Sequence, residues 1–198
     1  MCINQNELTA AIDQIIAESN RIQTCIQTGV QQYLEIQRQY DSMNPLGEDF
    51  LDCFSDFYVL TPQMTNVNRA NLLKLINSRT LVSIEEAIRS LIVPNDPAVN
   101  FSFATKALHT IDTSRPIYDL HVGHFFRLEQ ERNIENFEER IQQRVGLYNS
   151  LCAFFMDRNG NGLIRLAAAF DTIYPSIGNQ ISEVKKIDFM IWGFGRLF

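Results

Sequence analysis

Two ionisable side chains near the middle of the chain have the types and spacing for covalent chemistry. Lys106 lies in the largely apolar run Phe101–His109, and Asp119 opens the next helical pattern 13 residues later. Burial on an apolar helix lowers the pKa of a lysine, and the neutral amine is then a nucleophile. An aspartate beside it can act as a base or stabilise positive charge. The same residues also fit a purely structural interpretation, in which the Lys106 amine reaches the surface and Asp119 caps the helix beginning at Leu120.

The sequence predicts neither a metal site nor a cofactor. His121 and His124 are one helical turn apart and His109 is nearby, but no metal-binding frame such as HExxH surrounds them. We interpret them as solvated or locally hydrogen-bonded histidines. The loop 157–162 resembles the opening of an EF-hand loop, but the twelfth position is Ala168, where calcium needs a bidentate glutamate. A tight Asn-Gly turn between two helices is predicted there instead.

Helical periodicity runs through most of the chain and supplies the elements that must position these groups. Residues 5–40 place apolar side chains at three- and four-residue steps, which predicts one long amphipathic helix that ends before Pro45. Further helices are predicted over residues 47–60, 65–77, 84–92, 103–111, 120–128, 134–156, 163–173 and 182–194. No segment alternates like a strand. The predicted fold is all-α, a single globular bundle of about eight helices, in which a long N-terminal helix (1–44) packs on a helical domain (45–198).

Charge is distributed unevenly along the chain. The net charge is −6, yet residues 1–64 carry two basic against nine acidic side chains, whereas residues 65–127 carry seven against five. The segment with Lys106 and Asp119 is therefore the only third with a net positive charge, and DNA binding, if present, should be weak and sensitive to salt. The four cysteines form no CxxC pair, and no apolar run is long enough to span a bilayer. We expect a soluble, cytoplasmic protein with no membrane partner.

The order of motifs over residues 50–130 resembles the helix-hairpin-helix superfamily of DNA base-excision glycosylases. The segment Arg115-Pro-Ile-Tyr-Asp-Leu-His-Val-Gly-His-Phe-Phe126 is similar to the family's Pro-X-X-Asp motif before a valine-containing helix. Upstream, Ser102-Phe-Ala-Thr-Lys106 lies where the family has its Gly-X-Gly hairpin and catalytic lysine. Residues 57–63 and 80–87 are similar to the family's preceding helix, its glutamine and its short Pro-Thr helix. This sequence departs from the family in having Ser102 and Ala104 in place of the hairpin glycines, in a shorter Lys-to-Asp interval and in lacking a four-cysteine cluster.

The resemblance implies an all-helical DNA glycosylase, a hydrolase of base-excision repair. In such an enzyme Lys106 would attack the sugar C1′ of a flipped nucleotide to form a Schiff base, and Asp119 would stabilise the oxocarbenium-like sugar or activate the attacking group. The substrate-binding residues that it implies are Gln63 beside the base, Tyr58 or Tyr118 stacking on a base, Arg69 on a phosphate, and Ser102 and Ala104 at the hairpin.

The competing class is a non-catalytic helical module that binds nucleic acid or a protein. In that class Lys106 would be solvated, and the largest exposed apolar patch would lie on residues 5–40, through which a homodimer could also form. An enzyme instead needs Lys106 and Asp119 to face one concave pocket.

Overall fold

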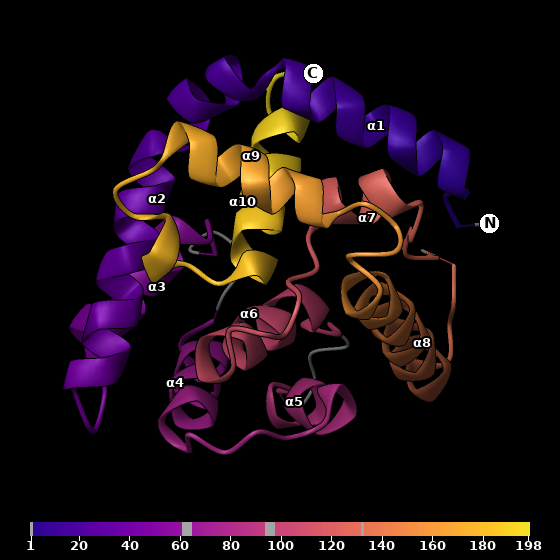
Figure 1. Cartoon of the computed structure of the whole chain (residues 1–198). Helices are drawn as coiled ribbons and strands as arrows, with labels where there is room; N and C mark the ends of the chain where they lie inside the picture. Colours follow the sequence, from indigo (N-terminus) through magenta and orange to yellow (C-terminus); the bar gives the residue numbers. More distant parts are fainter. Residues whose placement is uncertain (1, 61–64, 94–97, 132) are drawn as a thin grey trace.

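The computed structural model describes residues 2–60, 65–93, 98–131 and 133–198. These residues form ten α-helices and one short 3-10 helix, with no strand among them. Figure 1 shows α1 (Gln5–Ala17) and α2 (Ser19–Ser42) as an arc along one side of the molecule, while α10 (Glu183–Gly195) runs through its centre. The all-α prediction is confirmed. Within the described residues, no helix has the combination of length and apolar character that crossing a membrane requires.

The prediction of a single helix over residues 5–40 is wrong, because the chain breaks at Glu18. There φ is −93° and ψ is 7°, outside helical geometry, and α2 restarts at Ser19. Serine and asparagine, which follow at positions 19 and 20, are weak helix formers, so a break costs little here. The break turns α2 relative to α1 and makes the arc seen in Figure 1.

The apolar face of this arc is buried against the rest of the chain. Helices α1 and α2 contact α9 (Ile164–Ile173) and α10, and α2 also contacts α3 (Glu48–Phe57). The fully buried side chains of the two helices include Leu8, Ile12, Ile15, Ile22, Ile26 and Val30. Residues 5–40 therefore do not expose the apolar patch that a binding module would need, and a homodimer through them stays a prediction.

Two of the later helices begin at the capping side chains that the sequence suggests. Thr65 and Ser83 form capping boxes at the starts of α4 (Asn66–Asn77) and α5 (Ile84–Ser90). Both helices contact α6 (Phe101–Ile111), which carries Lys106. The other described helices are α7 (Leu120–Phe126), α8 (Phe137–Met156) and the 3-10 helix Gly178–Gln180.

Helix α10 is the central element, and nearly all of its side chains are buried. It contacts α2, α7 and α9. Its approach to α2 depends on Gly193, where an added Cβ would lie 2.6 Å from a methyl carbon of Ile26 and 2.8 Å from one of Ile22. Such distances leave no room for a side chain. This close packing fixes the face of α10 that points toward α6.

A buried histidine links α6 to α2. His109 is fully buried, its Nδ1 lies 2.6 Å from the Arg115 carbonyl oxygen, and its Nε2 lies 3.0 Å from the Tyr33 hydroxyl. A carbonyl only accepts, so Nδ1 carries the proton and Nε2 accepts from Tyr33 in the neutral ring. Burial, with Lys185 nearby, lowers the pKa of His109 to about 4.

We expect this histidine to make folding sensitive to acid. Between pH 6.5 and pH 4 the unfolded chain binds a proton at His109 that the folded chain does not, so stability falls as the pH falls. The loss at this one site reaches up to about 3 kcal/mol below the folded-state pKa. Urea unfolding across this range should show a shallower pH dependence for His109→Gln than for the wild type. Parallel curves for the two proteins would contradict this.

Candidate active site

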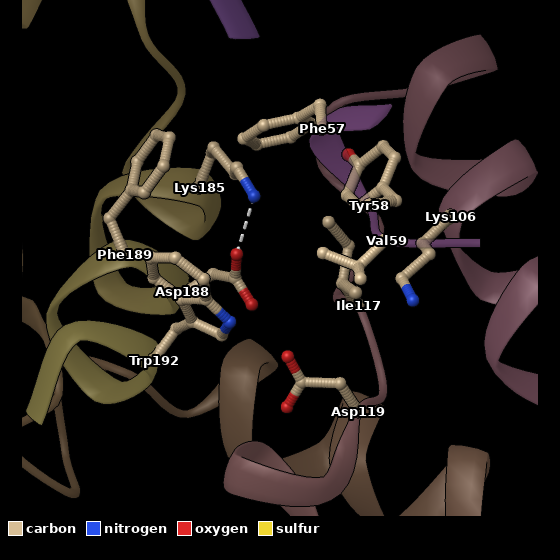
Figure 2. A pocket seen from close by; sticks show the side chains of 10 residues that line it. All are labelled: Phe57, Tyr58, Val59, Lys106, Ile117, Asp119, Lys185, Asp188, Phe189 and Trp192. Carbon is tan, nitrogen blue, oxygen red and sulfur yellow. Dashed lines mark hydrogen bonds and ion pairs between the residues drawn. The ribbon is translucent and has the colours of Figure 1, made fainter. Parts of the chain in front are cut away.

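A small pocket, with a cavity volume of about 60 Å³, lies where four parts of the fold meet. The C-terminal end of α3, helix α6, the segment before α7 and helix α10 all contribute to it. Figure 2 shows its lining side chains, with Tyr58 and Lys106 on one side and the residues of α10 on the other. The lining residues are Phe57, Tyr58, Val59, Lys106, Ile117, Asp119, Lys185, Asp188, Phe189 and Trp192. Lys106 and Asp119 thus line one concave pocket.

The Lys106 amine is buried, and no carboxylate of the described residues forms an ion pair with it. The residue is 7% exposed, and its Nζ donates a 2.9 Å hydrogen bond to the hydroxyl of Ser102, one turn earlier on α6. Burial lowers the pKa of Lys106 to about 8, and the more distant carboxylates of Asp119 and Asp188 offset only part of this effect. The interpretation in which Lys106 reaches the surface is therefore wrong. At pH 7 about a tenth of this amine is neutral, and so nucleophilic, which is far more than for an exposed lysine.

Asp119 has the structural role that the sequence predicts and also faces the pocket. Its Oδ1 accepts a 2.8 Å hydrogen bond from the Val122 backbone N–H and caps α7. The cap fixes the carboxylate at the start of the helix, and Figure 2 shows it pointing into the space between Lys106 and α10. The capping and catalytic interpretations of Asp119 are compatible.

The α10 side of the pocket contains a buried ion pair that the sequence analysis missed. Lys185 Nζ lies 2.6 Å from Asp188 Oδ2, and both residues are almost fully buried. The ammonium also lies 4.4 Å from the ring centroid of Phe189 and 5.1 Å from that of Tyr33. The available signal was a lysine and an aspartate three residues apart on a mostly apolar helix, a spacing at which the two side chains can pair.

Two polar atoms of this pocket have no hydrogen-bond partner among the described residues. They are Asp188 Oδ1 and the Tyr58 hydroxyl, and both are buried. Burial raises the pKa of Asp188 and, more strongly, that of Tyr58. The Tyr58 ring lies near both amines, its centroid 5.4 Å from Lys106 Nζ and 5.5 Å from Lys185 Nζ. Buried polar atoms without partners are costly, so these two atoms favour a bound group with hydrogen-bonding capacity.

The structure places the other predicted binding residues in different surroundings. Tyr118 is buried, and its hydroxyl donates to the Leu128 carbonyl at 2.6 Å. Ala104 is fully buried in the core, because it faces inward from α6 and not toward the pocket. Arg69 forms ion pairs with Asp52 and Glu48 near the N-terminal part of α3. Of this group only Tyr58 lines the pocket. Ser102 supports it through Lys106, and Gln63 lies outside the described residues.

A depressed lysine pKa has a consequence for stability that can be measured. Between pH 8 and pH 10.5 the unfolded chain holds a proton on Lys106 that the folded chain has released, so this site makes stability rise with pH. We expect the free energy of unfolding of the wild type, relative to Lys106→Met, to increase by up to about 3 kcal/mol across this range. Subtracting the variant cancels the opposite effect of the buried tyrosines. A constant difference between the two proteins would show that the amine is charged and solvated.

Comparison with known proteins gives no match. No protein-family model fits the chain, and no curated protein or solved structure matches it at a significant level. In the part of the chain that the structure describes, no group of three or more His, Cys, Asp or Glu side chains is arranged to hold a metal ion. Roles for the pocket residues therefore come from their geometry and chemistry.

Proposed function

We propose that the protein is a DNA base-excision glycosylase with Schiff-base lyase chemistry, in a fold of the helix-hairpin-helix glycosylase type. The observation that carries the proposal is the state of Lys106. It is a buried amine bonded to a neutral hydroxyl, with a pKa of about 8, in a pocket that it shares with the Asp119 carboxylate. Enzymes activate lysine for attack on carbon by this kind of desolvation.

The reaction uses groups that line the pocket. The neutral Lys106 amine attacks C1′ of the deoxyribose, and the C1′–N glycosidic bond breaks with its electron pair leaving on the base. Asp119 stabilises the positive charge that develops on the sugar and takes up the proton lost by the attacking amine. Opening of the sugar ring then gives an imine between Lys106 and C1′. Water hydrolyses this imine, or elimination of the 3′ phosphate precedes its release.

The chemistry of the rest of the pocket suits a flipped nucleobase, because aromatic walls surround a few polar atoms. The cavity itself has a volume of about 60 Å³, so a base enters only when these walls move apart. Asp188 Oδ1 accepts an N–H of the base, the Tyr58 hydroxyl forms a second hydrogen bond, and the Trp192 ring contacts its face. Gln63 stays a proposed neighbour of the base and Arg69 a proposed phosphate contact, whereas Ala104 and Tyr118 are buried and make no contact with the strand.

The direct test is reduction of the imine with borohydride, which converts it to a stable secondary amine. The protein is incubated with duplexes that contain an abasic site or a panel of damaged bases, reduced and separated by denaturing electrophoresis. We expect a covalent protein–DNA species with at least one substrate, at low salt because the contacts to DNA are few. Absence of any adduct and of any base release across the panel would overturn the proposal.

A further inference from the structure

A second hollow lies on the other side of Asp119 and contains Arg144, which forms no ion pair with any described residue. The hollow has a volume of about 290 Å³, and Asp119 belongs to both hollow and pocket. Ser102, which accepts the hydrogen bond from the Lys106 amine, also lines it. The remaining wall comes from Tyr118, from α7 and the residues after it, and from Arg144 of α8. Any ligand that enters this hollow therefore lies next to a molecule bound at Lys106 in the pocket.

Arg144 is buried, and its guanidinium is mostly unpaired. The residue is 7% exposed, and its one hydrogen bond to a described residue is a long one of 3.4 Å from NH2 to the Glu131 carbonyl oxygen. Its Nε and NH1 are buried and have no partner, and it forms no ion pair within the described residues. Arginine stays charged in proteins, so a buried guanidinium without an anion is a substantial cost to folding. Such a cost is recovered when an external anion binds.

The position and geometry of this arginine select the kind of anion. A guanidinium forms paired hydrogen bonds with the two oxygens of a phosphate or carboxylate. The exposed carboxylate of Glu129 lines the same hollow but forms no ion pair with Arg144. In a nucleic-acid strand each sugar is flanked by two phosphates, so a strand with its sugar at Lys106 and Asp119 brings a phosphate close to this hollow.

We propose that this hollow is a phosphate site, in which Arg144 binds a backbone phosphate next to the nucleotide held in the pocket. The DNA source of the phosphate rests on the proposed function, whereas the affinity of the hollow for phosphate does not. Gln130 supplies a neutral polar group beside the anion, and the carboxylates of Glu129 and Asp119 limit the affinity by repulsion. Arg144 is a binding and positioning residue, because it acts on the strand and not on the reacting carbon.

Inorganic phosphate tests the anion site without any assumption about catalysis. Thermal unfolding is followed with increasing sodium phosphate and compared with sodium chloride at equal ionic strength. We expect phosphate to stabilise the wild type more than chloride does, and Arg144→Met to weaken the apparent phosphate affinity by about tenfold or more. Glu129→Gln should strengthen it. Arg38→Met, which removes an exposed arginine paired with Glu35, is the matched control and should behave like the wild type. No phosphate-specific stabilisation of the wild type, or equal stabilisation of Arg144→Met, would overturn the proposal.

Modified DNA then identifies the source of the phosphate. Abasic duplexes are prepared with a neutral methylphosphonate at either phosphate next to the abasic site, and binding and borohydride adduct formation are both measured. At one of the two positions the modification should weaken binding by the wild type and have little further effect on Arg144→Met, because the variant has already lost that contact. The apparent KM should change more than the maximal rate.

The two proposals fail in different ways. Binding without a covalent adduct would contradict the lyase function, and the binding data alone would still measure the Arg144–phosphate contact. A normal adduct with equal methylphosphonate sensitivity in both proteins would contradict a DNA phosphate at Arg144 and leave the lyase function standing. Arg144→Lys, which keeps the charge and loses the paired geometry, should recover only part of the phosphate affinity.

Discussion

Replacement of Lys106 by methionine is expected to reduce borohydride-trapped adduct by at least about 10³-fold, because it removes the nucleophile and no other amine occupies its position. Lys185 lines the same pocket, but its ammonium is held 2.6 Å from Asp188 and is not available as a free amine. The methionine fills the same buried volume and removes the cost of burying an amine. We therefore expect Lys106→Met to be at least as stable as the wild type at neutral pH.

A matched control for this variant is Lys74→Met, which removes an exposed lysine on α4 outside the pocket. It should trap DNA like the wild type. The adduct is measured by denaturing electrophoresis with labelled DNA, and stability is measured by urea unfolding of the same samples. Undiminished trapping by folded Lys106→Met would assign the chemistry to another amine.

The second large effect is expected at Asp119, where two substitutions separate catalysis from capping. Asparagine is as good an N-cap as aspartate, so Asp119→Asn should keep the bond to the Val122 N–H and the stability of α7. It removes the negative charge, and we expect turnover to fall by about 10²- to 10⁴-fold. Asp119→Ala loses the cap as well and should destabilise the fold by about 1 kcal/mol more than Asp119→Asn.

These variants are compared by single-turnover rates of base release or strand cleavage and by equilibrium unfolding. A pattern in which Asp119→Asn retains the wild-type rate would limit the carboxylate to its capping role. If the rates of both variants fell only as far as their fractions of folded protein fell, the carboxylate would likewise be limited to its capping role.

Local sequence signals predicted the parts of the site that depend on neighbouring residues. The apolar run around Lys106 indicated an inward-facing helix, and Asp119 before Leu120 indicated a cap; both features are present. Thr65 and Ser83 likewise mark the helix starts where the chain has them. In each case the determining contacts lie within about one helical turn of the residue, so the sequence pattern carries them.

The parts that were not predicted depend on contacts between distant segments. Lys185 and Asp188 meet Tyr58 and Lys106 only because α10 passes through the centre of the fold. Arg144 lies on α8, which carries charged residues on several faces, and its sequence does not show which arginine is buried. The break at Glu18 was also missed. The apolar spacing continues through it, and the change of direction depends on the distant helices against which α1 and α2 pack.

The most direct measurement of the central claim is the position of the reduced adduct on the chain. Trypsin does not cleave after a modified lysine, so a sugar remnant on Lys106 would give a peptide from Ser90 to Arg127, because Arg115 precedes a proline and is not cleaved. Mass spectrometry of the borohydride-reduced complex with abasic DNA should find the remnant on this peptide, with fragmentation placing it at Lys106. A remnant at Lys185, at another lysine or at the amino terminus would contradict the assignment of Lys106 as the nucleophile.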